Sequence, residues 1–475
     1  MTGTRNRTTR CTADETVAII GGGLAGMAAA VALTEHGYHV ELFESRRRLG
    51  GRATSFEDAE TGEEIDHCQH VAMGCCTNFI DFCHRTGCSH LLRRDTRLDF
   101  FGPSGDQCRF SGSRWLPAPL HLAPALLRLR YLSLSERLGI GCTLLRLARL
   151  VPGEQHAKLT VAEWLSQQRQ TDRSIRCFWE VVLVSALAES LDRASLLAAR
   201  KVFVDGFLRS RKAYHVLIPM VPLQELYDAI ARWLSDHGTN IHIGARVATV
   251  RQLADCGSSL VLRDGRESTF DFAIVALPWR TAQPVLSAAL PHVARQAAGI
   301  ESSPITSLHL LFDRPLTSLP HAVLVDRLSQ WIFARPAGAI DDGALFPYQV
   351  VISASHRLKR RPRHEVLEEV LEDLHCAFPA AAGAQLVRWR MVTQPDAVFS
   401  VTPAFESQRP AQRTALPRVM LAGDWTQTGW PATMEGAVRS GYLAAEAILA
   451  ACGAKTSLVV ADLPAGWFAK WLGVA

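Results

Sequence analysis

The residues best able to do chemistry form a glycine-rich run behind a short apolar segment. Residues 17–20 are apolar and end at a turn, which is typical of a strand buried on both faces. Of the glycines that follow, Gly21 permits the tight turn, Gly23 lets the backbone approach a pyrophosphate, and Gly26 lets the next helix pack close to the strand. That helix, expected over residues 24–35, presents its N-terminal amides to a diphosphate. The run therefore predicts a dinucleotide site.

An acidic residue further along supports this prediction. A second strand, expected over residues 40–43, ends at Glu44, 18 residues after Gly26. A carboxylate there accepts hydrogen bonds from a ribose 2′-hydroxyl and disfavours a 2′-phosphate. The alternative is that the uncharged residues 16–34, which follow several arginines, form a signal peptide or a membrane span. Four glycines within six residues, at the spacing of a dinucleotide site, argue against that alternative.

Composition narrows the class of protein. A chain of 475 residues, 48% hydrophobic and 20% charged, is typical of a globular protein with two domains or one domain with a large insertion. A net charge of +5 does not indicate nucleic-acid binding. The 12 cysteines include no C-x-x-C pair, so we expect mostly buried thiols in a cytoplasmic protein, with neither a metal site nor a disulfide framework. Phosphoryl transfer and serine hydrolysis lack their sequence markers.

Two further segments are expected to complete the dinucleotide site. Residues 46–52 combine arginines with two glycines, which predicts a second phosphate contact, although a solvated loop is the alternative. Late in the chain, residues 419–422 form another short apolar strand, followed by Gly423, Asp424 and a helix expected over 433–449. This strand, loop and helix can return to the N-terminal sheet and present the helix N-terminus to the dinucleotide.

The region between these segments is expected to form a second sheet and a chamber. Residues 241–243, 247–250 and 260–262 alternate in polarity, which predicts a small meander that returns to a buried strand at 270–277. Residues 303–405 mix strands with an amphipathic helix near 365–378. We expect this part to provide the floor and walls of a substrate chamber.

Two segments have compositions that are typical of contact with a membrane surface. A helical block over residues 117–150 mixes leucines with five arginines, and no 18-residue apolar run occurs in it, so it does not span a bilayer. It can lie on a membrane with its arginines at the headgroups, or its leucines can pack against the fold. Trp467 and Trp471 near the C-terminus are similarly either interfacial anchors or packing residues.

With these pieces in place, the chain resembles the FAD-dependent amine oxidase and phytoene desaturase superfamily. The motifs that carry the resemblance are residues 21–26, Glu44 with 50–52, 273–278 and 421–424. Within the superfamily, residues 65–74 and 423–437 resemble the squalene-associated branch, the hydroxysqualene dehydroxylases. One departure is Cys68, which stands where family members often carry glycine.

The resemblance implies that the dinucleotide is FAD. The residues it assigns to the cofactor are Gly21, Gly23 and Gly26 at the pyrophosphate, Glu44 at the adenosine ribose, Gly51 and Arg52 at the phosphates, the Val247 backbone beside adenine, Gly423 and Asp424 at the ribityl chain and diphosphate, and Met434 near the flavin ring.

The resemblance also implies a reaction: reductive removal of the allylic hydroxyl of hydroxysqualene, which yields squalene, water and oxidised FAD. Ionisation of the C–O bond needs a proton on its oxygen, and hydride from reduced flavin captures the cation. Asp66, His70 and Glu435 lie in the relevant motifs and are candidate acids, with structural roles as the alternative. Trp425 and Trp430 either line the cavity or pack in the core.

The predicted architecture is an α/β fold of the flavin amine oxidase type, with a Rossmann-like FAD-binding domain and a mixed-sheet and helical substrate domain. Its predicted parts are a disordered tail (1–15), a discontinuous FAD-binding domain (16–75, 215–285 and 415–452), a substrate domain (76–214 and 286–414) with a helical, membrane-facing insert (115–205), and an amphipathic tail (453–475).

Two rival functions stay open. A carotenoid-type desaturase or an amine oxidase would use the same cofactor to oxidise its substrate. An amine oxidase usually has an aromatic cage and often a lysine near the flavin, and neither is identifiable in this sequence. A prenyl-lipid escort protein would bind without catalysis, which the intact Glu44 and Asp424 motifs argue against. The implied partners are a long-chain isoprenoid, the inner face of the plasma membrane as a peripheral contact for a cytoplasmic protein, and other enzymes of the squalene pathway.

Overall fold

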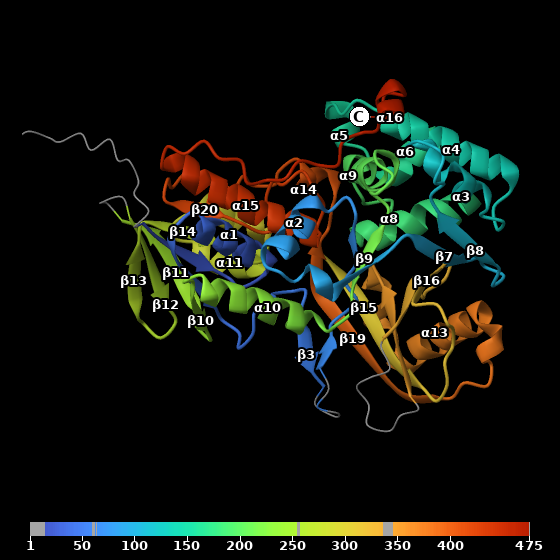
Figure 1. Ribbon diagram of the computed structural model, residues 1–475, viewed down its shortest axis with the longest axis horizontal. Helices are drawn as coiled ribbons and strands as arrows, with labels where there is room; N and C mark the ends of the chain where they lie inside the picture. The colour runs from blue at the N-terminus through green and yellow to red at the C-terminus, as the bar shows by residue number, and fades with distance from the viewer. Residues whose placement is uncertain (1–14, 59–61, 63, 254–256, 336–344, 475) are drawn as a thin grey trace, which may run out of the picture.

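The computed structural model describes residues 15–474 apart from 59–61, 63, 254–256 and 336–344. Figure 1 shows an elongated molecule with a parallel sheet at one end and a larger sheet with a group of helices at the other. Segments from the start, middle and end of the chain lie together in the first part, which therefore forms only when distant stretches of sequence meet.

The first part is built on a five-stranded parallel sheet in the order β10-β2-β1-β14-β20. Its strands are β1 (Thr16–Ile20), β2 (His39–Glu44), β10 (Asn240–Ile243), β14 (Phe272–Val275) and β20 (Val419–Leu421). Successive residues of β1 face opposite sides, because Val17 and Ile19 belong to one buried cluster and Ala18 and Ile20 to another. Both faces of the sheet are therefore covered, as its apolar strands predict.

The two faces are covered by different layers. On the Val17 side lie α1 (Leu24–Glu35), α10 (Leu223–Asp236) and α15 (Met434–Ala451), and on the Ala18 side lies an antiparallel sheet of β11 (Val247–Gln252), β12 (Ser258–Leu262) and β13 (Glu267–Phe270). The predicted helix over 24–35 matches α1 to the residue, and the helix predicted over 433–449 corresponds to α15.

Two details of the predicted meander are wrong. β10 belongs to the parallel sheet, where Ile243 pairs with Glu44, and the strand predicted over 270–277 is two strands, β13 and β14. The chain bends between them at Asp271, whose carboxylate accepts hydrogen bonds from the Thr16 amide and hydroxyl, both at 2.9 Å. Asp271 therefore lies where the chain passes from the antiparallel sheet, which contains β13, to the parallel sheet, which contains β14.

Two glycines allow the close packing of α1. A Cβ atom on Gly26 would lie 1.9 Å from the Gly21 carbonyl oxygen, and one on Gly441 of α15 would lie 2.3 Å from the Ala25 carbonyl oxygen. No side chain fits in either gap, because real Cβ atoms do not approach closer than about 3 Å. The role predicted for Gly26 in helix packing is confirmed, and Gly441 has the matching role between α1 and α15.

The second part centres on a seven-stranded mixed sheet. Its strands, in spatial order, are β19 (Leu386–Phe399), β15 (Ser302–Phe312), β18 (Phe346–Ile352), β17 (Trp331–Ala334), β16 (His321–Leu324), β7 (Arg97–Phe101) and β8 (Gln107–Ser111). All neighbours are antiparallel except β16 and β7. The predicted amphipathic helix is α13 (Arg363–Ala377), which buries Val366, Val370 and Leu374 against this sheet.

A group of helices closes the far end of the molecule (Figure 1). They are α3 (Ala123–Leu127), α4 (Leu134–Arg149), α5 (Glu154–Ala157), α6 (Val161–Gln167), α7 (Asp172–Ser174), α8 (Glu180–Leu187), α9 (Leu196–Phe203), the π-helices η3 (Ile175–Trp179) and η4 (Val204–Leu208), and α16 (Trp467–Trp471). The block predicted over 117–150 is helical but interrupted, because Ser133 and Glu136 form a capping box that begins α4. Among the described helices, none is long and apolar enough to cross a membrane.

Small elements join the two parts. They are β3 (Ser55–Glu57) with β4 (Glu64–Asp66), β5 (Ala72–Met73) with β9 (Val216–Pro219) and β6 (Leu92–Asp95), and the helices α2 (Thr77–Arg85), α11 (Trp279–Leu286), α12 (Pro291–Ala298) and α14 (Pro403–Glu406). Short 3-10 turns complete the set: η1 (Ser89–Leu91), η2 (Leu120–Leu122), η5 (Ser355–Arg360) and η6 (Pro379–Ala381).

The cysteines follow the prediction with one exception. Nine described cysteines are free thiols and six of these are buried. Cys452, at the end of α15, is instead bonded in a disulfide. The expectation of thiols alone is wrong at this position.

We expect Gly441→Val to separate α1 from α15, because the added side chain would meet the Ala25 carbonyl. The free energy of unfolding should fall by about 1–3 kcal/mol, as for other overpacked sites. Urea denaturation of the purified protein measures the change. The matched control is Ala450→Val, an exposed position of the same helix, which should change stability by well under about 1 kcal/mol. Equal effects of the two changes would contradict the packing argument.

Candidate active site

A large cavity joins the two parts of the molecule. Its volume is about 1210 Å³, which exceeds the roughly 300–1,000 Å³ of most small-molecule pockets. One end lies at the carboxyl ends of β1 and β2, where ligands bind in open parallel sheets, and the other lies among α3, α4, α8 and α9. The cavity therefore has room for a nucleotide and for a second, long molecule.

The predicted phosphate-binding turn forms one wall of this cavity. Gly21, Gly23 and Ala25 line it, and Gly21 adopts a φ of +112° that L side chains rarely take. Gly23 and Gly50 pair as an isolated bridge, so the two glycine segments meet beside the cavity. Within the described residues, no side chain caps α1, so its first amides remain free for an anion.

Glu44 is held in place by backbone amides. Its carboxylate accepts hydrogen bonds from the Gly22 amide at 2.9 Å and the Arg46 amide at 2.7 Å, and the residue is 6% exposed. A carboxylate has lone pairs left after two such bonds, and Glu44 lines the cavity. Glu44 is therefore placed to accept hydrogen bonds from the hydroxyl groups of a ribose. Val247, at the start of β11, lines the same end between Arg246 and Ala248.

The late strand and helix reach the same cavity, as the sequence predicted. Gly423 and Asp424 follow β20, Met434 begins α15, and all three line the cavity together with Gly21. Gly423 donates its amide hydrogen to the Ser440 hydroxyl at 2.7 Å, which fixes the loop to α15. The two ends of the chain thus meet on one ligand space.

Arg52 connects the two sides. Its guanidinium donates to the Asp424 carboxylate and, at 3.1 Å, to the Ala397 carbonyl, and it lies 4.8 Å from the centre of the Trp279 ring. This contact holds the loop after β2 against the loop after β20. If Arg52 also contacts a phosphate, as the sequence predicts, its guanidinium would bind the phosphate and the Asp424 carboxylate together.

His70 is the candidate acid that lines the cavity. Its Nδ1 lies 2.9 Å from the Cys68 carbonyl oxygen, and the Cys68 sulfur lies 3.9 Å from the ring. Burial lowers the pKa of His70, but the Cys68 thiol, the Asp66 carboxylate and the hydrogen bond to the Cys68 carbonyl raise it more, to about 9. The raised pKa favours the protonated form of His70, which can donate a proton.

The other two candidate acids lie outside the cavity lining. Asp66 accepts from the Ser55 hydroxyl at 2.6 Å and from the Leu223 amide at 3.0 Å, so it caps the start of α10. The Glu435 carboxylate is fully buried and accepts from the amides of Asn78 and Phe79. Both carboxylates accept hydrogen bonds from backbone amides at helix N-termini, which argues against a catalytic role for either.

Glu435 has a further partner in its own helix. Arg439 donates to its carboxylate at 3.0 Å, and the Asn78 side-chain amide does so at 2.9 Å. The contacts join α15 to α2 and support the structural alternative for Glu435 over a role as an acid.

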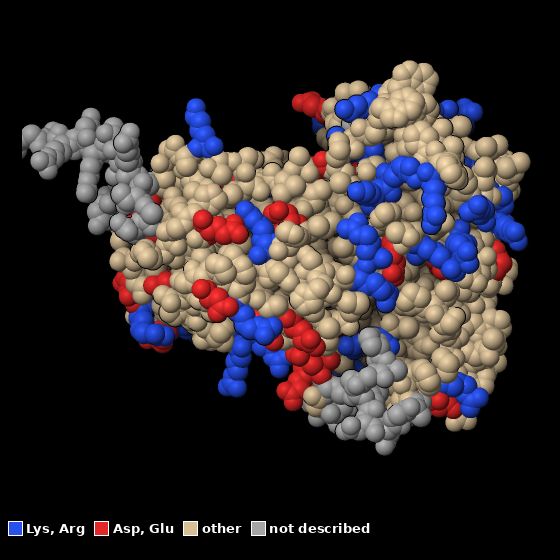
Figure 2. Space-filling model, in the orientation of Figure 1, with Lys and Arg blue, Asp and Glu red and all other residues tan. Residues whose placement is uncertain are grey.

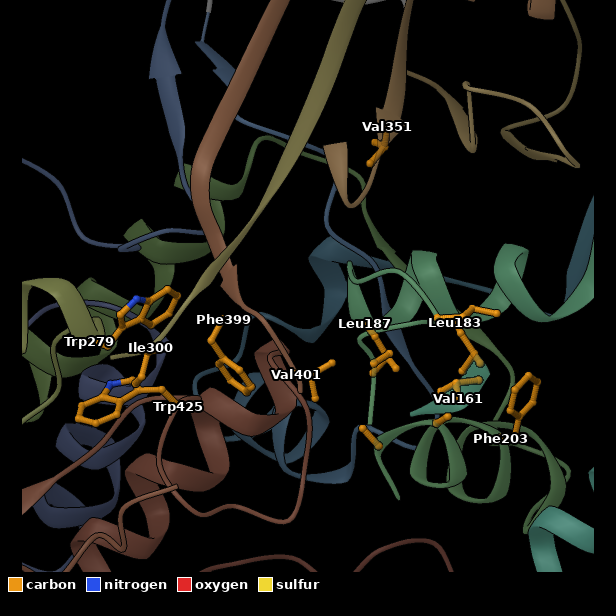
Figure 3. Close-up of a cluster of buried hydrophobic side chains, with 14 of the residues drawn as sticks. Val161, Leu183, Leu187, Phe203, Trp279, Ile300, Val351, Phe399, Val401 and Trp425 are labelled. Carbon is orange, nitrogen blue, oxygen red and sulfur yellow. The ribbon is translucent and has the colours of Figure 1, made fainter. Parts of the chain in front are cut away.

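The two tryptophans of the C-terminal motif are packing residues. Trp425 is fully buried and donates its indole hydrogen to the Leu277 carbonyl at 2.9 Å. Figure 3 shows it beside Trp279 and Ile300 at one end of the buried hydrophobic cluster. Trp430 packs under the cations of Lys201 and Arg439 at 4.6 and 5.5 Å. Neither ring lines the cavity.

Other aromatic residues supply the lining that sequence reasoning assigned to those tryptophans. They come from several elements and are Phe100, Phe110, Tyr131, Phe178, Phe203, Phe207, Trp331 and Phe333. Trp331 and Phe333 stack with their ring centres 5.5 Å apart, and the Trp331 indole donates to Ser185 at 3.0 Å. No spacing in the sequence marks these residues as a set. Phe100, Phe110, Trp331 and Phe333 lie on short strands, whereas the other four lie on helices or between elements.

Metal chemistry has no evident site here. Across the residues that the structure describes, no group of three or more His, Cys, Asp or Glu side chains could hold a metal ion.

These features define a nucleotide-dependent oxidoreductase fold with a separate substrate chamber. The family model for flavin containing amine oxidoreductase matches residues 24–449, and the chain belongs to this family. Putrescine oxidase has a similar solved structure, with a TM-score of 0.69 and 16% identity over 92% of this chain and 99% of that one. Cyclohexylamine oxidase from Brevibacterium oxydans has a TM-score of 0.67 and 19% identity over 93% and 99%.

Curated relatives are distant but match over 91–95% of this chain. Hydroxysqualene dehydroxylase from Rhodopseudomonas palustris is 27% identical over 92% of this chain and 99% of its own length. Zeta-carotene desaturase from Synechocystis sp. is 24% identical over 91% and 97%. A 15-cis-phytoene desaturase from Oncidium is 26% identical over 95% of this chain and 81% of its own length.

The protein is an FAD-dependent oxidoreductase, and its residues fit the cofactor. The free amides of α1 and the side-chain-free edge formed by Gly23 and Gly51 would hold the pyrophosphate, with Glu44 on the ribose. When bound, FAD supplies hydride transfer.

Glu44→Ala should weaken FAD binding by roughly 10–150-fold, the range for losing a hydrogen bond to a charged group. Fluorescence titration of the flavin-free protein measures the dissociation constant. Glu41→Ala is the matched control, since Glu41 lies on the same strand and pairs with His242 at 2.9 Å outside the cavity. Unchanged affinity in Glu44→Ala would contradict the assigned role.

Proposed function

We propose that this protein removes the allylic hydroxyl of hydroxysqualene by reduction and releases squalene. The observation that carries the proposal is the continuity of the cavity, in which the FAD end opens directly into a long chamber walled by leucine, valine and aromatic side chains. A C30 isoprenoid alcohol matches such a chamber, because it is apolar along its length and carries one polar group. Relatives named hydroxysqualene dehydroxylase support the proposal.

In this proposal, the chain's own residues perform three tasks. The apolar walls exclude water and hold the allylic carbon beside the FAD end. The protonated His70 imidazole, in the same lining, donates a proton to the departing hydroxyl oxygen, which leaves as water. The faces of Trp331, Phe333 and Phe100 offer negative ring charge to the allylic cation that remains.

A desaturase of carotenoid-like polyenes is the second candidate. Its support is that zeta-carotene and phytoene desaturases are about as similar to this chain as the dehydroxylases. The cationic His70 favours dehydroxylation, because loss of a hydroxyl needs a proton donor whereas desaturation removes hydrogen from carbon. A non-catalytic escort protein would not need the FAD residues that line the cavity.

The same proposal includes the cellular setting. A long isoprenoid partitions into lipid, so we place the protein in the cytoplasm, peripheral on the inner face of the plasma membrane, where it can associate with other enzymes of the squalene pathway.

Purified protein should be yellow and, after anaerobic reduction of its flavin, should convert hydroxysqualene to squalene with reoxidation of one flavin per product. Gas chromatography of the extract and the flavin absorbance measure the two events. Desaturation of a polyene with hydroxysqualene left unchanged would instead establish the second candidate. Protein without extractable flavin would contradict both.

The rate of dehydroxylation should depend on the protonation of His70. Its raised pKa means that the acid form is complete below about pH 8 and is lost as the pH rises through about 9. Single-turnover rates should therefore show a plateau and then a falling limb near pH 9. His70→Gln should lower the rate by about 10²–10⁴-fold and remove that limb.

Cys68→Gly offers a more conservative test of the same group. Because Cys68 raises the pKa of His70, its removal should move the falling limb to lower pH while the plateau rate changes little. A limb that stays in place in both variants would show that another group donates the proton.

A further inference from the structure

The cavity opens through a rim of exposed leucines. Leu120, Leu127 and Leu138 all line the cavity, and they are 37%, 46% and 56% exposed. Cys142, one turn beyond Leu138 on α4, is likewise exposed and lines the cavity. The same side chains therefore face both the chamber and the outside, which marks the entrance between α3 and α4.

Exposed tryptophans extend this rim on the outer surface. Trp115 is 93% exposed, and Trp467 and Trp471 of α16 are 75% and 74% exposed. α16 is fixed beside the entrance helices, because the Arg149 side chain at the end of α4 donates to the Leu472 carbonyl at 2.7 Å. A Cβ atom on Gly466 would lie 4.0 Å from the Ala118 side chain. The tryptophans and leucines thus belong to one region, formed by residues 114–142 and α16, which we call the entrance face.

The charges around the entrance face are almost all positive. Residues 114–142 contain four arginines and one glutamate, and α16 adds Lys470. Arg114, Arg128, Arg130 and Lys470 are exposed, as are Arg146 and Arg149 further along α4. Figure 2 shows blue side chains outnumbering red ones over the end of the molecule that carries α3, α4 and α16.

We propose that the entrance face docks on an anionic lipid bilayer, with its tryptophans and leucines among the acyl chains and its arginines at the headgroups. This proposal rests on the proposed function, because it supplies the route by which an isoprenoid reaches the chamber. Basic charge beside exposed Trp and Leu is the composition that binds a membrane interface. A second copy of the chain fits less well, since it would bring the same arginines against each other.

Docking in this way explains why the entrance is apolar. An entrance held at the depth of the acyl chains lets the substrate pass from lipid to chamber without exposure to water. The hydroxyl of the substrate is the one group that loses solvation on this path, and His70, which lines the same cavity, can receive it. Squalene, which lacks that hydroxyl, leaves by the same apolar route.

Flotation of the flavin-loaded protein with vesicles tests the proposal without any substrate. Phosphatidylcholine vesicles with phosphatidylglycerol should carry the protein upward, and vesicles of phosphatidylcholine alone should carry much less. The combined variant Trp115→Ser, Leu134→Ser, Trp467→Ser and Trp471→Ser, none of which lines the cavity, should reduce partitioning by at least about tenfold. Arg128→Gln with Arg130→Gln should cost about fivefold per arginine on the anionic vesicles.

Matched controls separate docking from folding. Val387→Ser with Met220→Ser removes exposed apolar residues elsewhere on the protein, 55% and 44% exposed, and should leave flotation unchanged. Flavin content and circular dichroism verify that each variant folds. A polarity-sensitive fluorophore on Cys142 should shift to the blue with anionic vesicles, and Cys142→Ser verifies the site of labelling.

Three results would overturn the proposal: flotation that the four-residue variant retains in full, equal loss in the control variant, or a stable dimer in solution that the four-residue variant dissolves. The last result would assign the entrance face to a second copy. Failure of the hydroxysqualene assay is a separate outcome, because flotation is measured without substrate; bilayer binding with no dehydroxylation would refute the reaction and keep the docking.

Discussion

The structure depends on one constraint: α1 lies against both the phosphate-binding turn and α15 with no side chain between them. The gaps at Gly26 and Gly441 are too small for any Cβ atom. This contact sets the distance between the turn after β1 and the loop after β20, and thereby aims the N-termini of two helices at one cavity. Because helix N-termini carry partial positive charge, the nucleotide end of the cavity suits an anion before any charged side chain is added.

Polarity divides the cavity along its length. Glycines, Glu44, Arg52 and Asp424 line the end near the parallel sheet, whereas leucines and aromatic rings line the end among the helices. A low dielectric at the second end strengthens the effect of any charge near it, and in the proposed reaction that charge is the imidazolium of His70, which lines the same cavity. The same division suits a cofactor with a charged diphosphate next to a substrate with almost no polar atoms.

The sequence predicted the local units and the return of the late strand and helix to the N-terminal sheet, but not the side-chain contacts between most distant elements. The bounds of α1 follow from glycine spacing and an apolar run, which are local signals. For Asp66 and Glu435 the sequence left an acid and a structural role open, because a helix-capping carboxylate and a catalytic one look alike in sequence. The residue whose amide Glu435 accepts, Asn78, is 357 positions away. β10 was placed in the wrong sheet, since a four-residue strand carries too little pattern to name its neighbour. The aromatic lining comes from many elements, and only the fold brings it together.

The contact between Arg52 and Asp424 has a consequence for biosynthesis. The two residues are 372 positions apart, and a ribosome adds roughly 5–20 residues per second. One side of the nucleotide site is therefore translated roughly 20–75 s before the other. During that interval the nascent chain has only one side of the site. Loading of the flavin must therefore follow translation of β20 and α15.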